Sequence, residues 1–313
     1  MATFKGTREA FAAAMMELAD NGKDVYGVYP DALKSMRGVP LAEKYPTRYV
    51  ETGIAEQAAV DVAAGMATTG AIPFVGTYCG FITMRAGEQM RTFVGYTNLN
   101  VKFAGFNAGC LGGEREGVTH QFYEDLSFVT SLPNFTVLTP ADGNQLYHAT
   151  LYAAEIEGPV YIRGGSGREE DVFPLDAPFS KDGITVLKEY GTEALLLSNG
   201  FVLDRVLAAG EALNKAGVKV TVADINILYG KNPDKILEEM AKTDLVVTVE
   251  DHNINGGLGS YISRLATENR PVKVKRIALE DYAESGPAKE LGDHMGFSVE
   301  NITQVVKKAL GKI

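Results

Sequence analysis

The chain has 313 residues, a length typical of two domains, and its 45% hydrophobic and 22% charged residues are those of an ordinary globular protein. Its net charge of −10, without any basic run, makes nucleic acid and anionic membrane surfaces poor partners. No segment reaches the roughly 18 uninterrupted apolar residues of a membrane span, and two cysteines outside any CxxC motif favour a reducing, cytoplasmic setting.

Helical and strand patterns alternate through the first half of the chain. A helix is predicted from Thr7, as its N-cap, to about Leu18, and another helix carries Glu56 and stops at Gly70. The other predicted elements here are strands at 24–29, 71–78, 99–106, 135–139 and 159–163 and helices at 83–96 and 142–155. Such alternation predicts a mostly parallel sheet that is covered by helices on both faces.

A polar, proline-containing segment interrupts this alternation and is predicted to be a linker, residues 171–190. After it the pattern restarts, with strands at 193–198, 218–224, 244–250 and 272–278 and helices from about Val202, Pro233, Gly259 and Val299. We therefore expect an α/β protein of two consecutive doubly wound domains, residues 1–170 and 191–313.

Glu56 is an unusual residue for its position. It lies in the first turn of a helix whose other residues are mostly small and apolar, from Ile54 to Ala67. A carboxylate there is explained either by the favourable helix dipole or by chemistry. The residues of this segment alone leave both explanations open.

Two glycine-rich loops could bind a ligand. The first, residues 107–120, follows a predicted strand and ends at His120, which is where open α/β sheets bind ligands. The second, "GGLG" after His252, would either hold an anion at a helix N-terminus or simply start the helix. No GxSxG, HExxH, Walker loop or complete GxGxxG is present.

Four segments, in the same order, resemble the transketolase and deoxyxylulose-phosphate synthase family. They are "RYVETGIAEQAAVDVAAGMA" around Glu56, "RAGEQMR" at 85–91, "GEREGVTHQ" around His120, and "VEDHNINGGLGS" at 249–260. The resemblance implies a thiamine-pyrimidine-binding domain followed by a transketolase C-terminal domain. It also implies thiamine diphosphate and Mg²⁺ as cofactors.

The resemblance assigns roles to four residues around the cofactor. Glu56 would hydrogen-bond a ring nitrogen of the aminopyrimidine and favour its imino tautomer, which requires surroundings that exclude water. Phe81 matches the aromatic residue that stacks on the pyrimidine, with Tyr78 beside it. His120 matches the histidine that contacts the reacting hydroxyls of the substrate.

Other matched positions concern the sugar. Arg8, Ser35 and Arg163 correspond to residues that bind the phosphate tail, and Arg163 ends a strand, which suits an anion clamp. Two positions depart from the family pattern. Asn107 stands where a phosphate-binding histidine is usual, and Glu116 stands where an aspartate contacts the acceptor, so a sulfonated or branched sugar becomes a candidate beside ordinary pentose phosphates.

The sequence contains no GDG motif, which in this family belongs to the domain that holds the diphosphate and its metal. We therefore expect a C-terminal transketolase subunit that works with an N-terminal subunit, in an α2β2 assembly, and transfers a two-carbon ketol unit from a ketose to an aldose. A 2-oxoacid dehydrogenase β subunit and a non-catalytic subunit of the same fold are the alternatives.

Overall fold

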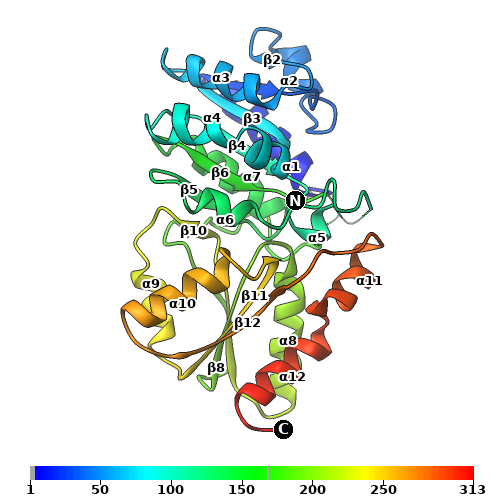
Figure 1. Ribbon diagram of the computed structural model, residues 1–313, viewed down its shortest axis with the longest axis vertical. Helices are drawn as coiled ribbons and strands as arrows, with labels where there is room; N and C mark the ends of the chain where they lie inside the picture. The colour runs from blue at the N-terminus through cyan, green and yellow to red at the C-terminus, as the bar shows by residue number, and fades with distance from the viewer. Residues whose placement is uncertain (1–3, 114, 168) are drawn as a thin grey trace.

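The computed structural model describes residues 4–113, 115–167 and 169–313. The chain contains two sheets, one above the other in Figure 1. Each sheet and its helices form one α/β layer; these two layers are the first and second domains, and they meet at the middle of the molecule. Among the described residues, no helix is long and apolar enough to cross a membrane.

The first sheet has seven strands, which are parallel except for one edge strand. In spatial order they are β10 (Ile227–Tyr229), β5 (Thr136–Leu138), β6 (Val160–Arg163), β4 (Lys102–Phe106), β3 (Ile72–Tyr78), β1 (Val25–Tyr29) and β2 (Tyr49–Glu51). Adjacent residues of β3, Phe74 and Val75, enter different apolar clusters, as successive strand residues must. Both faces are therefore covered, and the sheet is doubly wound as predicted.

Helices cover each face of the first sheet. One face carries α1 (Thr7–Asp20), α2 (Val39–Lys44) and α7 (Gly143–Ala153), and the other carries α3 (Glu56–Ala67) and α6 (Asp125–Val129). The helix predicted at 83–96 also lies on this second face, but it is built of two π-helical segments, η1 (Phe81–Arg85) and η2 (Met90–Gly95), around the short α4 (Gly87–Gln89). Such π-helical turns are frequent at functional sites.

Two predicted helix starts can be compared with the structure. The helix predicted from residue 142 begins there: Asp142 caps α7, because its Oδ1 accepts a hydrogen bond from the Gln145 amide at 2.7 Å. Thr7 does not cap α1: Gly6 holds that position, and the Thr7 hydroxyl accepts from the Gly165 amide instead. Thr7 thus ties the start of α1 to the segment that follows β6.

The second sheet has five strands. In order they are β12 (Lys273–Leu279), β11 (Leu245–Asn253), β8 (Ala194–Asn199), β9 (Val220–Asp224) and β7 (Thr185–Glu189). Its helices are α8 (Leu203–Lys215), α9 (Asp234–Met240), α10 (Leu258–Glu268), α11 (Ala288–Gly292) and α12 (Val299–Ala309), with the short segments η3 (Gly200–Val202) and η4 (Asp293–Phe297).

The linker prediction needs two corrections. Strand β7 lies within the segment expected as linker and pairs antiparallel with β9, so the second sheet begins at Thr185. Strand β10 comes after the linker in sequence yet pairs antiparallel with β5 of the first sheet. One apolar cluster also runs from α3 to α10, so the two layers share a core and are not independent units.

Candidate active site

Several predicted site residues lie along the carboxyl-terminal edge of the first sheet, where the parallel strands β1, β3, β4 and β6 all end. Tyr78 is the last residue of β3, and Phe81 begins η1 three residues later. Asn107 follows β4, and Arg8 lies in the first turn of α1. The edge therefore combines two aromatic rings, a cation and an amide.

An aromatic cluster forms the centre of this edge. The rings of Tyr78, Phe81 and His120 lie 5.3 Å apart, centroid to centroid, in all three pairs, with edge-to-face geometry. Phe122 extends the cluster, 5.5 Å from Phe81. A Cβ on Gly80 would lie 1.8 Å from Phe122 Cδ1, so glycine is required for this packing. The glycine-rich loop thus brings His120 onto the residues that follow β3.

Glu56 is only 7% exposed, and its Oε1 accepts a hydrogen bond from Arg85 Nη1 at 2.8 Å. The guanidinium of Arg85 also lies over the Phe81 ring, with Cζ 3.9 Å from the centroid. A flat, positively charged N–H donor therefore occupies the space between Glu56 and Phe81. A protonated aminopyrimidine is likewise planar and carries N–H donors, so Glu56 and Phe81 fit such a ring once Arg85 moves. The Arg85 side chain is 52% exposed, which leaves it room to move.

Arg8 and Asn107 lie beside the aromatic cluster. Arg8 Nη2 donates to Asn107 Oδ1, and the Arg8 guanidinium lies 5.4 Å from the Tyr78 ring centroid. Asn107 is completely buried and adopts φ 57°, a left-handed conformation that asparagine tolerates better than most residues. Arg8 Nε and Asn107 Nδ2 are buried without a hydrogen-bond partner among the residues that the structure describes. Buried donors of this kind are rare and suit a polar ligand.

Ser35 and Glu116 lie outside these contacts. The Ser35 hydroxyl donates to the Ala32 carbonyl within the loop after β1. Glu116 is exposed in the turn that leads to His120, and its amide donates to the Gly113 carbonyl. Their predicted roles remain predictions.

Arg163 requires a correction. It is 1% exposed and pairs with the buried carboxylate of Asp125 through Nε at 3.0 Å and Nη2 at 3.1 Å, while Nη2 also donates to the Asp251 carbonyl. Burial opposes ionisation of Asp125, but the charge of Arg163 and the hydrogen bonds from Arg163 and Tyr161 outweigh it and lower its pKa. The Arg163 charge is already neutralised inside the protein, so this residue joins the two layers and does not clamp a phosphate.

The second glycine-rich turn does not hold an external anion. The carboxylate of Glu250 accepts from the amides of Leu258 and Gly259, at 2.6 and 2.7 Å, and so occupies the N-terminus of α10. His252 is buried, and burial lowers its pKa to about 4, so it is neutral. The open question about "GGLG" is therefore decided in favour of a helix start.

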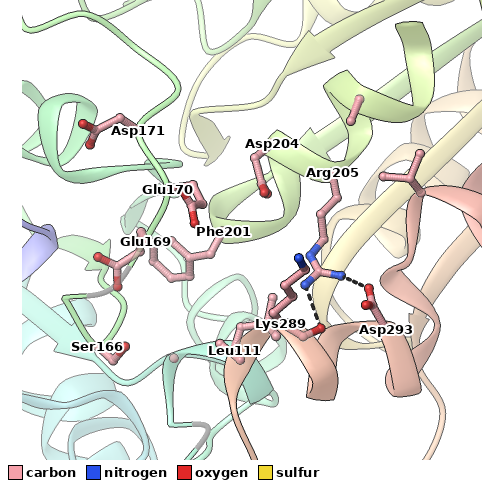
Figure 2. A pocket seen from close by; sticks show the side chains of 14 residues that line it. Leu111, Ser166, Glu169, Glu170, Asp171, Phe201, Asp204, Arg205, Lys289 and Asp293 are labelled. Atoms are coloured by element: carbon pink, nitrogen blue, oxygen red, sulfur yellow. Dashed lines mark hydrogen bonds and ion pairs between the residues drawn. The ribbon is translucent and has the colours of Figure 1, made fainter. Parts of the chain in front are cut away.

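A separate cavity of about 530 Å³ lies where the two layers meet, shown in Figure 2. Acidic side chains, among them Glu169, Asp204 and Asp293, line it together with Arg205 and Lys289. Arg205 pairs with Asp293 at 2.6 Å. The aromatic cluster does not line this cavity, so the cavity and the candidate site are different places.

Comparisons with known proteins decide the family. Residues 5–166 match the pyrimidine-binding domain of transketolase, and residues 183–302 match the transketolase C-terminal domain. The chain belongs to the transketolase family. These matches do not favour the two alternatives, a 2-oxoacid dehydrogenase subunit and a non-catalytic subunit.

The similar proteins include transketolase subunits. The chain is 31% identical to an apulose-4-phosphate transketolase subunit of Actinobacillus succinogenes, over 91% of this chain and 92% of that protein. It is 28% identical to a 6-deoxy-6-sulfo-D-fructose transketolase subunit of Clostridium sp., over 95% and 92%. A solved split-gene transketolase, described as an inactive β4 tetramer, is 34% identical with a TM-score of 0.88 over 99% of both chains.

Two residues of the site have no role in the sequence prediction. Phe122 follows the "THQ" of the resembling segment, and Arg85 begins "RAGEQMR". An arginine four residues after the expected stacking aromatic gives no indication that its side chain will fold back over the ring, since that contact depends on the π-helical turn.

Proposed function

We propose that this chain is the C-terminal subunit of a two-chain, thiamine diphosphate-dependent transketolase, which transfers a two-carbon ketol unit from a ketose to an aldose. The observation that carries the proposal is the convergence of a shielded carboxylate, Glu56, a stacking ring, Phe81, and an imidazole, His120, at one sheet edge. A fold alone would not indicate this chemistry.

Glu56, Phe81 and Tyr78 would hold the pyrimidine end of the cofactor. When bound, thiamine diphosphate supplies a nucleophilic carbon and an electron sink for breaking a carbon–carbon bond. Glu56 would hold a proton at a ring nitrogen, and its burial keeps water from competing for that proton. Phe81 would orient the ring by stacking, in the place that the Arg85 guanidinium takes in this chain.

His120, Arg8 and Asn107 would bind the sugar. His120 would exchange a proton with a reacting hydroxyl, and the hydrogen bond between its Nδ1 and Thr119 Oγ1, at 2.9 Å, fixes the ring orientation. The positive charge of Arg8 and the unused donor capacity of Asn107 Nδ2 suit an anionic tail, with Ser35 and Glu116 as further candidate contacts. Phosphate and sulfonate tails both present negatively charged oxygens that can accept these hydrogen bonds. The two similar subunits act, by their names, on a phosphorylated and a sulfonated sugar.

A partner chain would complete the site. The helical segments α3, η1 and η2 pack together beside Glu56. Large apolar side chains are exposed on or next to them, namely Ile54 (77%) before α3, Met84 (56%) in η1 and Tyr96 (85%) after η2. An N-terminal subunit that covers them would supply the diphosphate and Mg²⁺ contacts, in an α2β2 assembly. The split-gene protein of similar structure is inactive as a tetramer of β chains, which supports this division of labour.

The function is tested by reconstitution with an N-terminal transketolase subunit, thiamine diphosphate and Mg²⁺. We expect ketol transfer in the complex only. The kcat/KM for acceptors with a phosphate or sulfonate tail should exceed that for the same aldoses without a tail. Ribose 5-phosphate is the reference acceptor, and its kcat/KM should be below that of the best acceptor because of Asn107 and Glu116. Absence of transfer with every acceptor, or tight metal-dependent cofactor binding by the isolated chain, would contradict the proposal.

A further inference from the structure

Three consecutive residues at the end of β11 bind backbone amides in three different places. Glu250 accepts from Leu258 and Gly259 of α10, as described above. Asp251 accepts from the amides of Cys110 and Leu111, both at 2.9 Å, through its two carboxylate oxygens. The Leu126 amide donates to His252 Nε2 at 3.2 Å. All three side chains are fully buried.

The amides that Asp251 accepts belong to α5 (Gly109–Gly112), in the glycine-rich loop of the first domain. The start of α5 closely contacts the carboxylate. A Cβ on Gly109 would lie 2.1 Å from Asp251 Oδ2, and Gly109 has φ 81°, so another residue there would be strained and would displace the carboxylate. The position of α5 is therefore set by a residue of the second domain.

Short helix α5 in turn contacts both substrate-side residues. A Cβ on Gly112 would lie 2.8 Å from the carbonyl carbon of Asn107, and one on Gly113 would lie 2.3 Å from the carbonyl oxygen of His120. The Gly109 amide donates to the Phe122 carbonyl at 2.7 Å. With so little space between these backbones, a movement of α5 must move Asn107, His120 or both.

A second link runs between the loop and the second domain. Gln121 Nε2 donates to the Cys110 carbonyl at 3.3 Å and to the Glu284 carbonyl at 2.9 Å. Gln121 is 1% exposed. Asp251 therefore holds the loop near its start, at Cys110 and Leu111, and the Glu284 carbonyl holds it near its end, at Gln121.

We propose that Asp251 is a positioning residue: through the α5 amides it fixes the relative places of Asn107 and His120, so the second domain controls sugar binding without a side chain in the site. The part that concerns sugar binding rests on the proposed function. Asparagine at this position would offer a single acceptor oxygen, so one of the two α5 amides would lose its partner.

Glu250→Gln is a matched control for Asp251→Asn. Both carboxylates are fully buried, both accept two helix-start amides, and burial raises the pKa of both. Glu250, however, binds α10 of its own domain, whereas Asp251 binds the loop of the other domain. General loss of stability should be similar for the two variants, and only Asp251→Asn should affect the sugar.

The first measurement is hydrogen exchange by mass spectrometry on the isolated chain. Asp251→Asn should speed exchange in peptides that cover residues 107–122, and Glu250→Gln should speed it in peptides that cover 255–262. Unchanged exchange at 107–122 in Asp251→Asn would overturn the positioning role. This arm does not depend on which reaction the protein catalyses.

The second measurement is kinetics of the reconstituted complex. Misplacement of substrate contacts by about 1 Å costs up to ~100-fold, so kcat/KM for the acceptor should fall roughly 10- to 100-fold in Asp251→Asn, mainly through KM, and less than about twofold in Glu250→Gln. Equal losses in both variants would overturn the proposal.

If Asp251→Asn does not fold, Gln121→Leu replaces it and should show the same increase in KM; a wild-type KM would be contrary evidence. A wild-type complex without transfer would reject the proposed function and leave the exchange result valid.

Discussion

The ends of β4 and β11 show how similar strand ends serve different purposes. Asn107 follows β4 with a buried amide nitrogen that finds no partner in the described chain, next to rings that are partly exposed. Asp251 lies near the end of β11 with both carboxylate oxygens bound to backbone amides. A polar residue at a strand end therefore indicates a ligand site only when its hydrogen-bonding capacity is left unused.

The two arginines at this edge teach the same lesson. The sequence predicts binding of an anionic tail for both Arg163 and Arg8. Arg163 is buried against Asp125, whereas Arg8 is partly exposed and its buried Nε has no partner among the described residues. The four predictions below test this division into site and scaffold, from the largest expected effect to the smallest.

Glu56→Gln should leave folding intact and reduce turnover of the reconstituted complex by about 100- to 10,000-fold, the usual range for a lost acid–base group. Glutamine fills the same space but cannot hold the proton. Turnover and the urea midpoint are the measurements. Asp61→Asn, on the exposed side of α3, is the control and should keep turnover within about twofold. Full activity of Glu56→Gln would make Glu56 a helix-end charge only.

Arg163→Met should lower the free energy of unfolding by about 3–5 kcal/mol, because it leaves the Asp125 carboxylate buried without its cation. Urea unfolding followed by circular dichroism measures this, since the chain has no tryptophan. Arg8→Met should change stability by less than about 1 kcal/mol and raise KM for an anionic acceptor. Equal destabilisation by the two substitutions would remove the distinction between them.

Asp224→Asn should flatten the pH dependence of stability. Burial raises the pKa of Asp224 from its ordinary value of 3.8 to about 7, so the folded protein binds a proton that the unfolded chain releases. This group therefore costs stability as pH rises from about 4 to about 7, by up to roughly 1.4 kcal/mol per pH unit. Urea midpoints at pH 5 and pH 8 should differ less in the variant; an unchanged difference would mean that Asp224 ionises normally.

Arg85→Ala should raise the affinity of the reconstituted complex for thiamine diphosphate by a few fold. The Arg85 guanidinium covers the Phe81 ring and forms an ion pair with Glu56, so it must be displaced by the cofactor. Because the Arg85 side chain is 52% exposed, this ion pair contributes at most about 1 kcal/mol. Isothermal titration calorimetry measures the change. Arg91→Ala, in the neighbouring η2 and exposed, is the control. Weaker cofactor binding would mean that Arg85 holds the cofactor and does not occupy its place.

Much of the fold follows from the sequence alone. The alternation of short apolar runs with amphipathic helices determines two doubly wound layers, because buried parallel strands and half-buried helices need those patterns. The local sequence is also enough to place the start of α7 at Asp142. The short edge strands β7 and β10 are not predicted, since three to five residues of edge strand carry little periodic signal and their pairing depends on the rest of each sheet.

For the site, the sequence alone identifies the family and the residues of the edge, because Glu56, Phe81 and His120 lie in or beside segments of specific spelling. Only the tertiary structure separates Arg8 from Arg163 and fills the "GGLG" turn with Glu250. The physical reason is that burial and partners decide whether a charge is available to a ligand, and those partners come from distant parts of the chain. Asp125, 38 residues before Arg163, and Asp251, 140 residues after Leu111, make contacts that no local pattern encodes.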